Sequence, residues 1–288
     1  MTEQNIYVRI DDTEVFLNNP LIIAQISDSH LFADEDSLHC GKNVYQHFVS
    51  VLAEIKQNKA INYLIFTGDL TQDHSEESYQ LFARAIKQNN ISVPVLFLSG
   101  NHDETELLNK HLINAPFLSD KLIQNNEWQI LLVESKSKVI EGPAGQVDED
   151  ELLKISGSID SKKRQLIFMH HHPVDVGYFI DKHGLQQADL FWKTINNHAS
   201  ISGIACGHIH RALTLFPDVS TGNVTVYTCP ATSIQFDPLA NSVQALEQGP
   251  GYRLFYLDDQ KNITSSVHYI DEKDINKKRM SDTVYNDQ

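Results

Sequence analysis

The chain has 288 residues and a formal net charge of −15, from 23 Lys and Arg against 38 Asp and Glu. Hydrophobic residues make up 41% and charged residues 21% of the sequence, which is ordinary for a globular protein and excludes a disordered chain. The acidic balance argues against a nucleic-acid partner, because phosphate backbones are bound mainly through Lys and Arg.

Cysteine usage and hydropathy give an expectation about the compartment. Cys40, Cys206 and Cys229 are widely spaced and form no CxxC pair, which favours reduced thiols. The first residues lack the basic and apolar regions of a secretory signal, and no run approaches the roughly 20 apolar residues that span a bilayer. We therefore expect a cytoplasmic protein without a membrane partner. The sequence leaves its oligomeric state open.

Short apolar runs recur along the chain and predict buried strands. They are rich in β-branched and aromatic residues and do not alternate strictly, as expected for strands covered on both faces. Helical spacing of apolar residues separates several of them, and Asp73 with Glu76 forms a predicted capping pair before the second helix. In chain order the predicted elements are strand 21–26, helix 44–55, strand 63–66, helix 79–86, strands 93–98 and 128–133, a helix from Asp148, strand 166–169, helix 190–195, and strands 201–206, 224–227 and 252–257.

Alternating strands and helices predict an α/β protein with a largely parallel or mixed sheet. The segments 224–227 and 252–257 have no helix between them, so we expect them to pair and to indicate a second, mixed sheet. We find no repeat or linker, which favours a single domain over residues 1–270. Residues 271–288 are polar without a periodic apolar face and are expected to be a loosely attached tail.

Polar clusters follow the apolar runs and offer metal ligands. Ligands of α/β sheets gather at the carboxyl ends of strands, and Asp, Asn and His bind divalent ions. A donor set without cysteine favours Mn, Fe or Zn over Ca. The clusters are Asp28-Ser29-His30, Gly68-Asp69, Gly100-Asn101-His102-Asp103, His170-His171-His172-Pro173 and Gly207-His208-Ile209-His210.

The spacing within the clusters predicts how the donors meet. Asp28 and His30 lie two apart in what we expect to be an extended loop, which would aim both side chains to one side. Asp69 has two carboxylate oxygens with which to bridge two ions. Each cluster alone could be an ordinary turn or helix cap, but all five in order favour one shared site. The other histidines are expected on the surface or on helices, with His183 a candidate pocket residue: His39, His47, His74, His111, His198 and His268.

The order of these clusters resembles the calcineurin-like metallophosphoesterase superfamily. The phrases Thr67–Asp73 and Cys206–His210, with the histidine run, resemble bacterial class III 3′,5′-cyclic AMP phosphodiesterases over roughly residues 20–270. The resemblance implies a four-layer α-β-β-α sandwich of two mixed sheets, with a dinuclear site of Fe or Mn, or alternatively Zn, at the carboxyl ends of the strands. It assigns Asp28, His30 and His210 to one ion, Asn101, His170 and His208 to the other, and Asp69 to both. His171 competes with His170, because it stands two residues before Pro173.

The same resemblance implies hydrolysis of cyclic AMP to 5′-AMP by in-line attack of a metal-bridging hydroxide. His102 would act at the leaving 3′-oxygen, and Asp103 would orient His102 or support its loop. His30, Asn101, His102 and His210 would contact the substrate, a small phosphodiester. Alternative hypotheses for the function are a glycerophosphodiester-type hydrolase, a broad-specificity phosphatase, a nuclease, or a non-catalytic scaffold. The complete ligand set with His102 argues against a scaffold.

Overall fold

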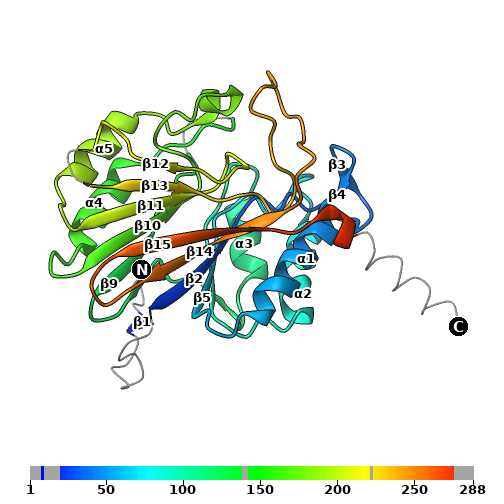
Figure 1. Ribbon diagram of the computed structural model, residues 1–288, viewed down its shortest axis with the longest axis horizontal. Coiled ribbons are helices and arrows are strands. Elements are labelled where there is room, and N and C mark those ends of the chain that lie inside the picture. The colour runs from blue at the N-terminus through cyan, green and yellow to red at the C-terminus, as the bar shows by residue number, and fades with distance from the viewer. Residues whose placement is uncertain (1–7, 10–19, 138–141, 221–222, 276–288) are drawn as a thin grey trace, which may run out of the picture.

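The structure, a computed structural model, describes residues 8–9, 20–137, 142–220 and 223–275 and contains two mixed β-sheets (Figure 1). The seven-stranded sheet has the order β1 (Val8–Arg9), β8 (Leu122–Gln124), β9 (Trp128–Leu132), β10 (Arg164–Met169), β11 (Ile201–Cys206), β13 (Thr225–Thr228), β12 (Thr214–Leu215). The six-stranded sheet has the order β15 (Ile263–Tyr269), β14 (Gly251–Leu257), β2 (Leu21–Ile26), β5 (Tyr63–Phe66), β6 (Val95–Phe97), β7 (Phe117–Leu118).

Helices cover the outer face of each sheet. Helices α1 (Val44–Gln57) and α2 (Glu76–Gln88) pack on the six-stranded sheet, and the short α3 (Thr105–His111) follows β6. Helices α4 (Glu149–Ser158) and α5 (Ala188–Asn196) pack on the seven-stranded sheet. A hairpin of β3 (Leu38–His39) and β4 (Lys42–Asn43) and a 3-10 helix (Phe179–His183) lie outside these layers.

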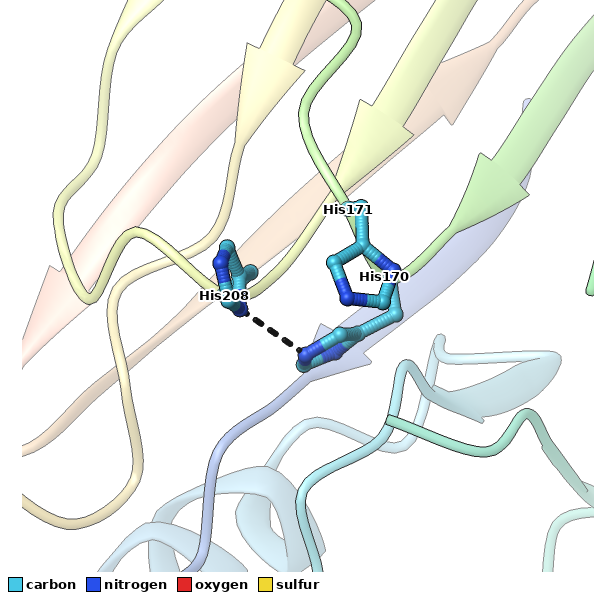
Figure 2. A group of neighbouring side chains, drawn as sticks. All are labelled: His170, His171 and His208. Carbon is cyan, nitrogen blue, oxygen red and sulfur yellow. Dashed lines mark hydrogen bonds between the residues drawn. The ribbon is translucent and has the colours of Figure 1, made fainter. Parts of the chain in front are cut away.

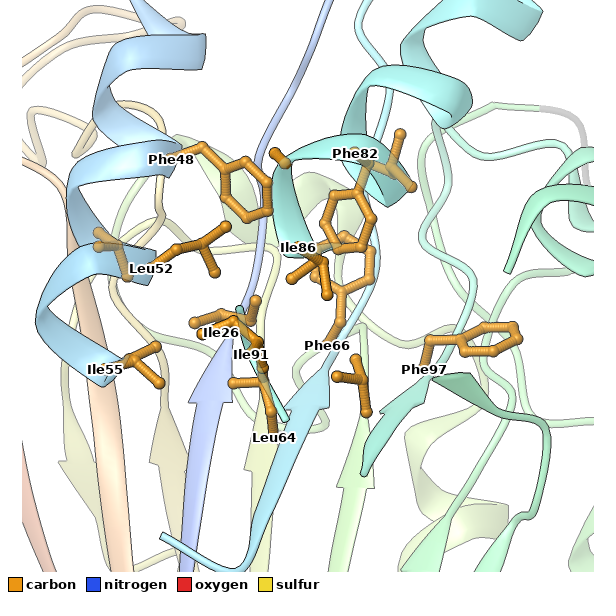
Figure 3. Packing of buried hydrophobic residues seen from close by; sticks show 14 of the residues in the cluster. Ile26, Phe48, Leu52, Ile55, Leu64, Phe66, Phe82, Ile86, Ile91 and Phe97 are labelled. Atoms are coloured by element: carbon orange, nitrogen blue, oxygen red, sulfur yellow. The ribbon is translucent and has the colours of Figure 1, made fainter. Parts of the chain in front are cut away.

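Three apolar interfaces hold the four layers together. Under α1 and α2, the ring of Phe82 lies 4.9 Å from that of Phe48 and 4.7 Å from that of Phe66, between centroids (Figure 3). Between the sheets, the rings of Phe168 and Phe255 meet edge to face at 5.5 Å. Strands buried on both faces need apolar residues at successive positions, which explains the unbroken runs in the sequence. The predicted four-layer sandwich of two mixed sheets is confirmed.

Parallel pairing sets the position of the loops. Strands β2, β5 and β6 are parallel in one sheet, and β9, β10, β11 and β13 are parallel in the other. Their carboxyl ends therefore project loops from the same edge of each sheet.

Two local predictions were wrong. Strands β13 and β14 do not pair, because β13 joins β11 while β14 runs antiparallel to β2 and β15 in the other sheet. Helix α2 is capped by Ser75, whose side chain accepts from the Ser78 N–H, while the Asp73 carboxylate accepts the hydroxyl of Ser75 at 2.6 Å. Ser75 is the cap because it directly precedes Glu76, the first helical residue, whereas Asp73 lies two residues further back.

The predicted tail falls mostly outside the described residues, at 276–288. Its first part is held at Glu272, which forms an ion pair with Lys42 at 2.7 Å. Within the described ranges, no helix combines the length and apolar character needed to cross a membrane.

Candidate metal centre

Loops from both sheets converge on one place. Asp28, Asp69 and Asn101 follow β2, β5 and β6 of the six-stranded sheet, and His170 and His208 follow β10 and β11 of the seven-stranded sheet. Backbone hydrogen bonds join the loops: the Asp28 N–H donates to Gly68 O at 2.9 Å, and the Gly207 N–H donates to His170 O at 3.1 Å. The His208 N–H donates to the Asp28 carboxylate across the two sheets, at 3.0 Å.

The backbone is left-handed at five of the predicted ligands. Their φ angles are 57° for Asp28, 45° for His30, 57° for Asp69, 69° for His208 and 50° for His210. The extended loop expected for Asp28 and His30 is therefore wrong: left-handed residues turn their side chains inward by tight local curvature. Each such residue costs of order 1 kcal/mol or more, and strain of this kind concentrates at functional sites.

Glycine lets two of the loops touch. A Cβ on Gly68, whose φ is 98°, would lie 2.4 Å from the backbone nitrogen of Gly100. Only a residue without a side chain fits this contact, which places Asp69 beside Asn101.

The first donor group consists of Asp28, His30 and His210, all buried. The Nε2 atoms of His30 and His210 lie 3.1 Å apart, and His210 Nε2 lies 3.4 Å from Asp28 Oδ1. The other ring nitrogen of His210, Nδ1, donates to Ile234 O at 2.8 Å. This bond fixes the tautomer of the neutral ring, in which the lone pair of Nε2 faces the group.

The second donor group consists of Asn101, His170 and His208. His170 Nε2 lies 3.1 Å from Asn101 Oδ1 and 3.2 Å from His208 Nδ1, the latter drawn in Figure 2. The Nδ1 atom of His170 donates to Thr67 O at 2.7 Å, so its Nε2 also faces inward without a proton when the ring is neutral.

Asp69 lies between the two groups. Its Oδ2 is 3.7 Å from His30 Nε2 and 3.4 Å from His170 Nε2. Its Oδ1 instead accepts the backbone N–H of His102 at 2.8 Å. A single oxygen therefore faces both groups, which replaces the expectation that each carboxylate oxygen would face one ion.

The donor geometry fits bound cations. In the first donor group, ligand atoms of His30, His210 and Asp28 face one another at 3.1–3.4 Å in a buried space, and such atoms repel unless a proton or a cation lies between them. Ligands about 2.0–2.2 Å from one ion have this mutual spacing. Neutral imidazole, carboxylate and amide oxygen form a donor set suited to Mn, Fe or Zn.

In the metal-free protein, His170 and Asp69 shift each other's pKa. Burial lowers the pKa of His170, but the Asp69 carboxylate and its other partners raise it to about 9. Burial raises the pKa of Asp69, but the neighbouring His170 holds it well below its usual range. Burial lowers the pKa of His30 and of His208 well below the ordinary value, so both rings are neutral at pH 7. His170 must therefore lose a proton to bind an ion.

The neighbouring His171 uses both ring nitrogens elsewhere. Its Nδ1 lies 2.9 Å from Ser135 Oγ and its Nε2 lies 3.2 Å from Pro143 O, while its backbone N–H donates to the same Ser135 Oγ. Its ring packs against those of His170 and His208, as Figure 2 shows. These contacts favour His170 over His171 as the ligand, while a ring nitrogen of His171 also lies within 4.8 Å of ligand atoms of His170 and His208. The choice of His170 stays a prediction.

His102 and Asp103 have separate surroundings. The ring of His102 meets that of His30 edge to face at 4.8 Å, and its Nδ1 is buried without a hydrogen-bond partner among the described residues. The Asp103 carboxylate accepts the N–H groups of Leu70 at 2.8 Å and Gly100 at 2.9 Å. Asp103 therefore supports the loop, which is one of the two roles expected of it, and its assignment as a catalytic residue stays a prediction.

Several residues near the centre were not predicted there. His39 stacks on His30 with centroids 5.7 Å apart, and His74 stacks on His102 at 5.8 Å. Phe236 stacks on His210 at 3.8 Å. His47 is buried in α1 and binds Ser233 O through Nδ1. None of the four directly follows a predicted strand, so only the folded topology brings them to the centre.

Three comparisons place the chain among known proteins. The family model described as calcineurin-like phosphoesterase matches residues 21–212. A probable cyclic nucleotide phosphodiesterase from Colwellia psychrerythraea is 52% identical over 85% of this chain and 94% of its own length. The 3′,5′-cyclic adenosine monophosphate phosphodiesterase CpdA of Escherichia coli is 31% identical over 85% of this chain and 88% of its own length.

A solved structure shares the fold at low sequence identity. A dimetal phosphatase from Danio rerio superposes with a TM-score of 0.65 and 13% identity, covering 88% of this chain and 98% of that one. The shared fold agrees with the two sheets and their converging loops. The family match, which spans strands and loops from β2 to beyond β11, shows that the chain belongs to the calcineurin-like phosphoesterase family.

Proposed function

We propose that the chain hydrolyses 3′,5′-cyclic AMP to 5′-AMP. Its family makes it a metal-dependent phosphodiesterase, and the names of its relatives in Colwellia psychrerythraea and Escherichia coli support a cyclic nucleotide as the substrate. The observation that carries the proposal is the complete donor set with His102 at its rim. Asn101 and His102 are half-buried while the other donors are buried, so a substrate would enter on their side.

In this proposal Asp28, His30 and His210 hold one ion, and Asn101, His170 and His208 hold the other. Asp69 Oδ2 is shared between them. Fe or Mn is the proposed metal, with Zn as the alternative, because the donors are nitrogen and oxygen. Two such ions supply positive charge for the phosphoryl oxygens and acidity for a water molecule.

The remaining chemistry falls to the chain itself. His102 would give a proton or a hydrogen bond to O3′ as the P–O3′ bond breaks, because O3′ leaves as an alkoxide unless it is protonated. Asp103 would hold the loop of His102 through the N–H groups of Leu70 and Gly100. His30, Asn101 and His210 would border the bound phosphate. We place the reaction in the cytoplasm, which the three free cysteines support.

A substrate panel tests the proposal. Purified protein with added Mn²⁺ would be given cyclic AMP, cyclic GMP, glycerophosphocholine and p-nitrophenyl phosphate, and products would be separated by chromatography. We expect the highest kcat/KM for cyclic AMP and 5′-AMP as the product. Equal rates across the panel, or a preference for glycerophosphocholine, would contradict the substrate assignment. Formation of 3′-AMP would contradict the placement of His102 at O3′.

A further inference from the structure

The reaction itself places the nucleoside relative to His102. In a 3′,5′-cyclic phosphate the leaving oxygen stays on the ribose: water adds to phosphorus, the P–O3′ bond breaks and O3′ takes up a proton. If His102 acts at O3′, the ribose and its base lie on the His102 side of the donor groups. This step rests on the proposed function.

Two further histidines flank the centre on that side. The ring of His74 lies parallel to that of His102, with a centroid distance of 5.8 Å and an interplanar angle of 5°. The ring of His39 lies parallel to that of His30 at 5.7 Å and 7°. His30 and His102 themselves meet edge to face at 4.8 Å. Four imidazoles thus form a continuous row from His74 to His39.

The outer members of this row are accessible and come from separate segments. His74 is exposed in the loop between β5 and α2, and His39 is half-buried at the end of β3. Neither imidazole ring is hydrogen-bonded to another of the described residues, so both rings are available to a ligand.

Both segments are held firmly, so the rings are pre-positioned. The His74 N–H donates to Thr71 Oγ1 at 3.0 Å, and the Asp73 carboxylate accepts the Ala33 N–H at 2.8 Å, which joins this loop to the one before β3. On the other side, Lys42 of the hairpin forms ion pairs with Glu247 at 3.2 Å and with Glu272 at 2.7 Å. A rigid site loses little conformational entropy when a ligand binds.

We infer that His39 and His74 form the subsite for the purine base of the substrate. Flat aromatic faces stack on nucleobases, and ring nitrogens can accept from or donate to the edge of a base. Neither residue is among the metal donors, and both lie next to a residue proposed to contact the reacting phosphate. Their role is substrate binding, which affects KM rather than the bond-breaking step.

Single Ala variants at His39 and His74 test this subsite with two substrates that share the reacting ring. One is cyclic AMP and the other is 1-O-methylribose 3′,5′-cyclic phosphate, which has no base. We expect each variant to raise KM for cyclic AMP about tenfold, the effect of losing a stacking contact of about 1.4 kcal/mol. For the base-free substrate, KM and kcat should stay within about twofold of wild type, and His39→Phe and His74→Phe should restore most of the affinity for cyclic AMP.

Binding and metal content separate this role from a structural one. The Kd of a slowly hydrolysed phosphorothioate analogue of cyclic AMP, measured by calorimetry, should rise in parallel with KM. Metal content by atomic emission should stay at the wild-type value. His198→Ala is the matched control, because His198 lies before β11, at the end of that strand opposite to His208.

Three results would overturn the inference. They are an unchanged KM for cyclic AMP in both variants, an equal loss with the base-free substrate, and a loss of bound metal that accounts for the kinetic change. Failure of the proposed function looks different: metal-loaded wild type would then not hydrolyse cyclic AMP at all, whatever the variants do.

Discussion

The two parts of His102 act on different partners. Its backbone N–H donates to Asp69 Oδ1 at 2.8 Å, while its ring faces His30 at the half-buried side of the centre. An Ala at this position keeps the N–H and therefore the placement of Asp69. The side chain and the metal donors can thus be separated by mutation.

His102→Ala should lower kcat for cyclic AMP about 10²- to 10⁴-fold, the range for removing a general acid. Metal content should remain that of wild type, since the backbone contact to Asp69 is preserved. Steady-state kinetics and atomic emission on the same sample check both statements. A parallel loss of metal would instead make His102 a ligand or a structural residue.

The ion pair of His170 with Asp69 predicts a pH dependence in the metal-free protein. The folded-state pKa of His170 is about 9 against an ordinary value of 6.5, so the folded chain holds this proton more tightly than the unfolded chain. Its stabilising contribution is therefore complete below about pH 6.5 and is lost as pH rises through about 9. The free energy of unfolding of chelator-treated protein should fall between pH 7 and pH 9.

Urea denaturation at pH 7, 8 and 9 measures this slope. His170→Gln should flatten it. His171→Gln is the matched control and should keep it, because burial lowers the pKa of His171 well below its ordinary value and that ring stays neutral over the whole interval. A wild-type slope in His170→Gln would contradict the assignment.

At the scale of the element, β14 is held by a buried arginine without a carboxylate partner among the described residues. Arg253 is 3% exposed and donates to Thr228 O at 3.0 Å, Leu213 O at 2.9 Å and Ser265 Oγ at 2.8 Å. It thereby joins β14 of one sheet to the end of β13 in the other. These three hydrogen bonds connect β14 with the end of β13. They stabilise the part of the chain that follows the metal-binding loops.

Arg253→Met should lower the free energy of unfolding by about 2–4 kcal/mol, because it removes charged hydrogen bonds and takes the arginine donor from the carbonyl of buried Thr228, while Leu213 O keeps the N–H of Thr228 at 3.1 Å. Lys261→Met is the control: Lys261 forms an exposed pair with Glu127 at 3.1 Å, and such pairs contribute about 1 kcal/mol or less. Urea denaturation of both variants measures the two losses in the free energy of unfolding. Equal losses would show that Arg253 adds no more than a surface pair.

Strands were predictable from the sequence where both faces are buried. Segments such as 21–26 and 201–206 are largely apolar, and the structure has strands with the same bounds. Strand β15 was missed because it is only half-buried and its residues lack a continuous apolar run. The pairing of β13 with β14 was mispredicted because neighbours in sequence can join different sheets, and only long-range packing decides this.

The positions of the candidate donors were predictable for the same reason. Each follows a recognisable strand, and parallel strands end at one edge. The left-handed backbone of Asp28 and His30 was not predictable, because it is imposed by contacts with other loops such as the bond from Asp28 N–H to Gly68 O. The positions of His39 and His74 near the centre were not predicted, because their loops carry no periodic pattern.

For the whole molecule, the two donor groups draw on both sheets. Asp28 and His30 belong to the six-stranded sheet and His210 to the loop of the seven-stranded sheet, while Asn101 meets His170 and His208 in the same way. Cations bound here would hold the sheets together at one edge.

Metal removal should therefore destabilise the entire fold. We expect Tm to fall after treatment with a chelator and to rise again with Mn²⁺ in a concentration-dependent way, because a ligand of the folded state adds RT ln(1 + [L]/Kd) to stability. Differential scanning calorimetry at several Mn²⁺ concentrations measures the effect. A variant that lacks the shared carboxylate, Asp69→Ala, should show no such rise; a full response in this variant would disprove the role of Asp69.

The sharing of donors between the sheets also makes the geometry of the centre depend on remote packing. Phe168 and Phe255 pack edge to face between the sheets and are not among the donors, yet their bulk sets how one sheet packs on the other. A smaller side chain at either position would let one sheet shift against the other. The donors from the two sheets would then move relative to one another. Inherited or engineered substitutions in this packing between the sheets would thus change the turnover rate without altering a donor.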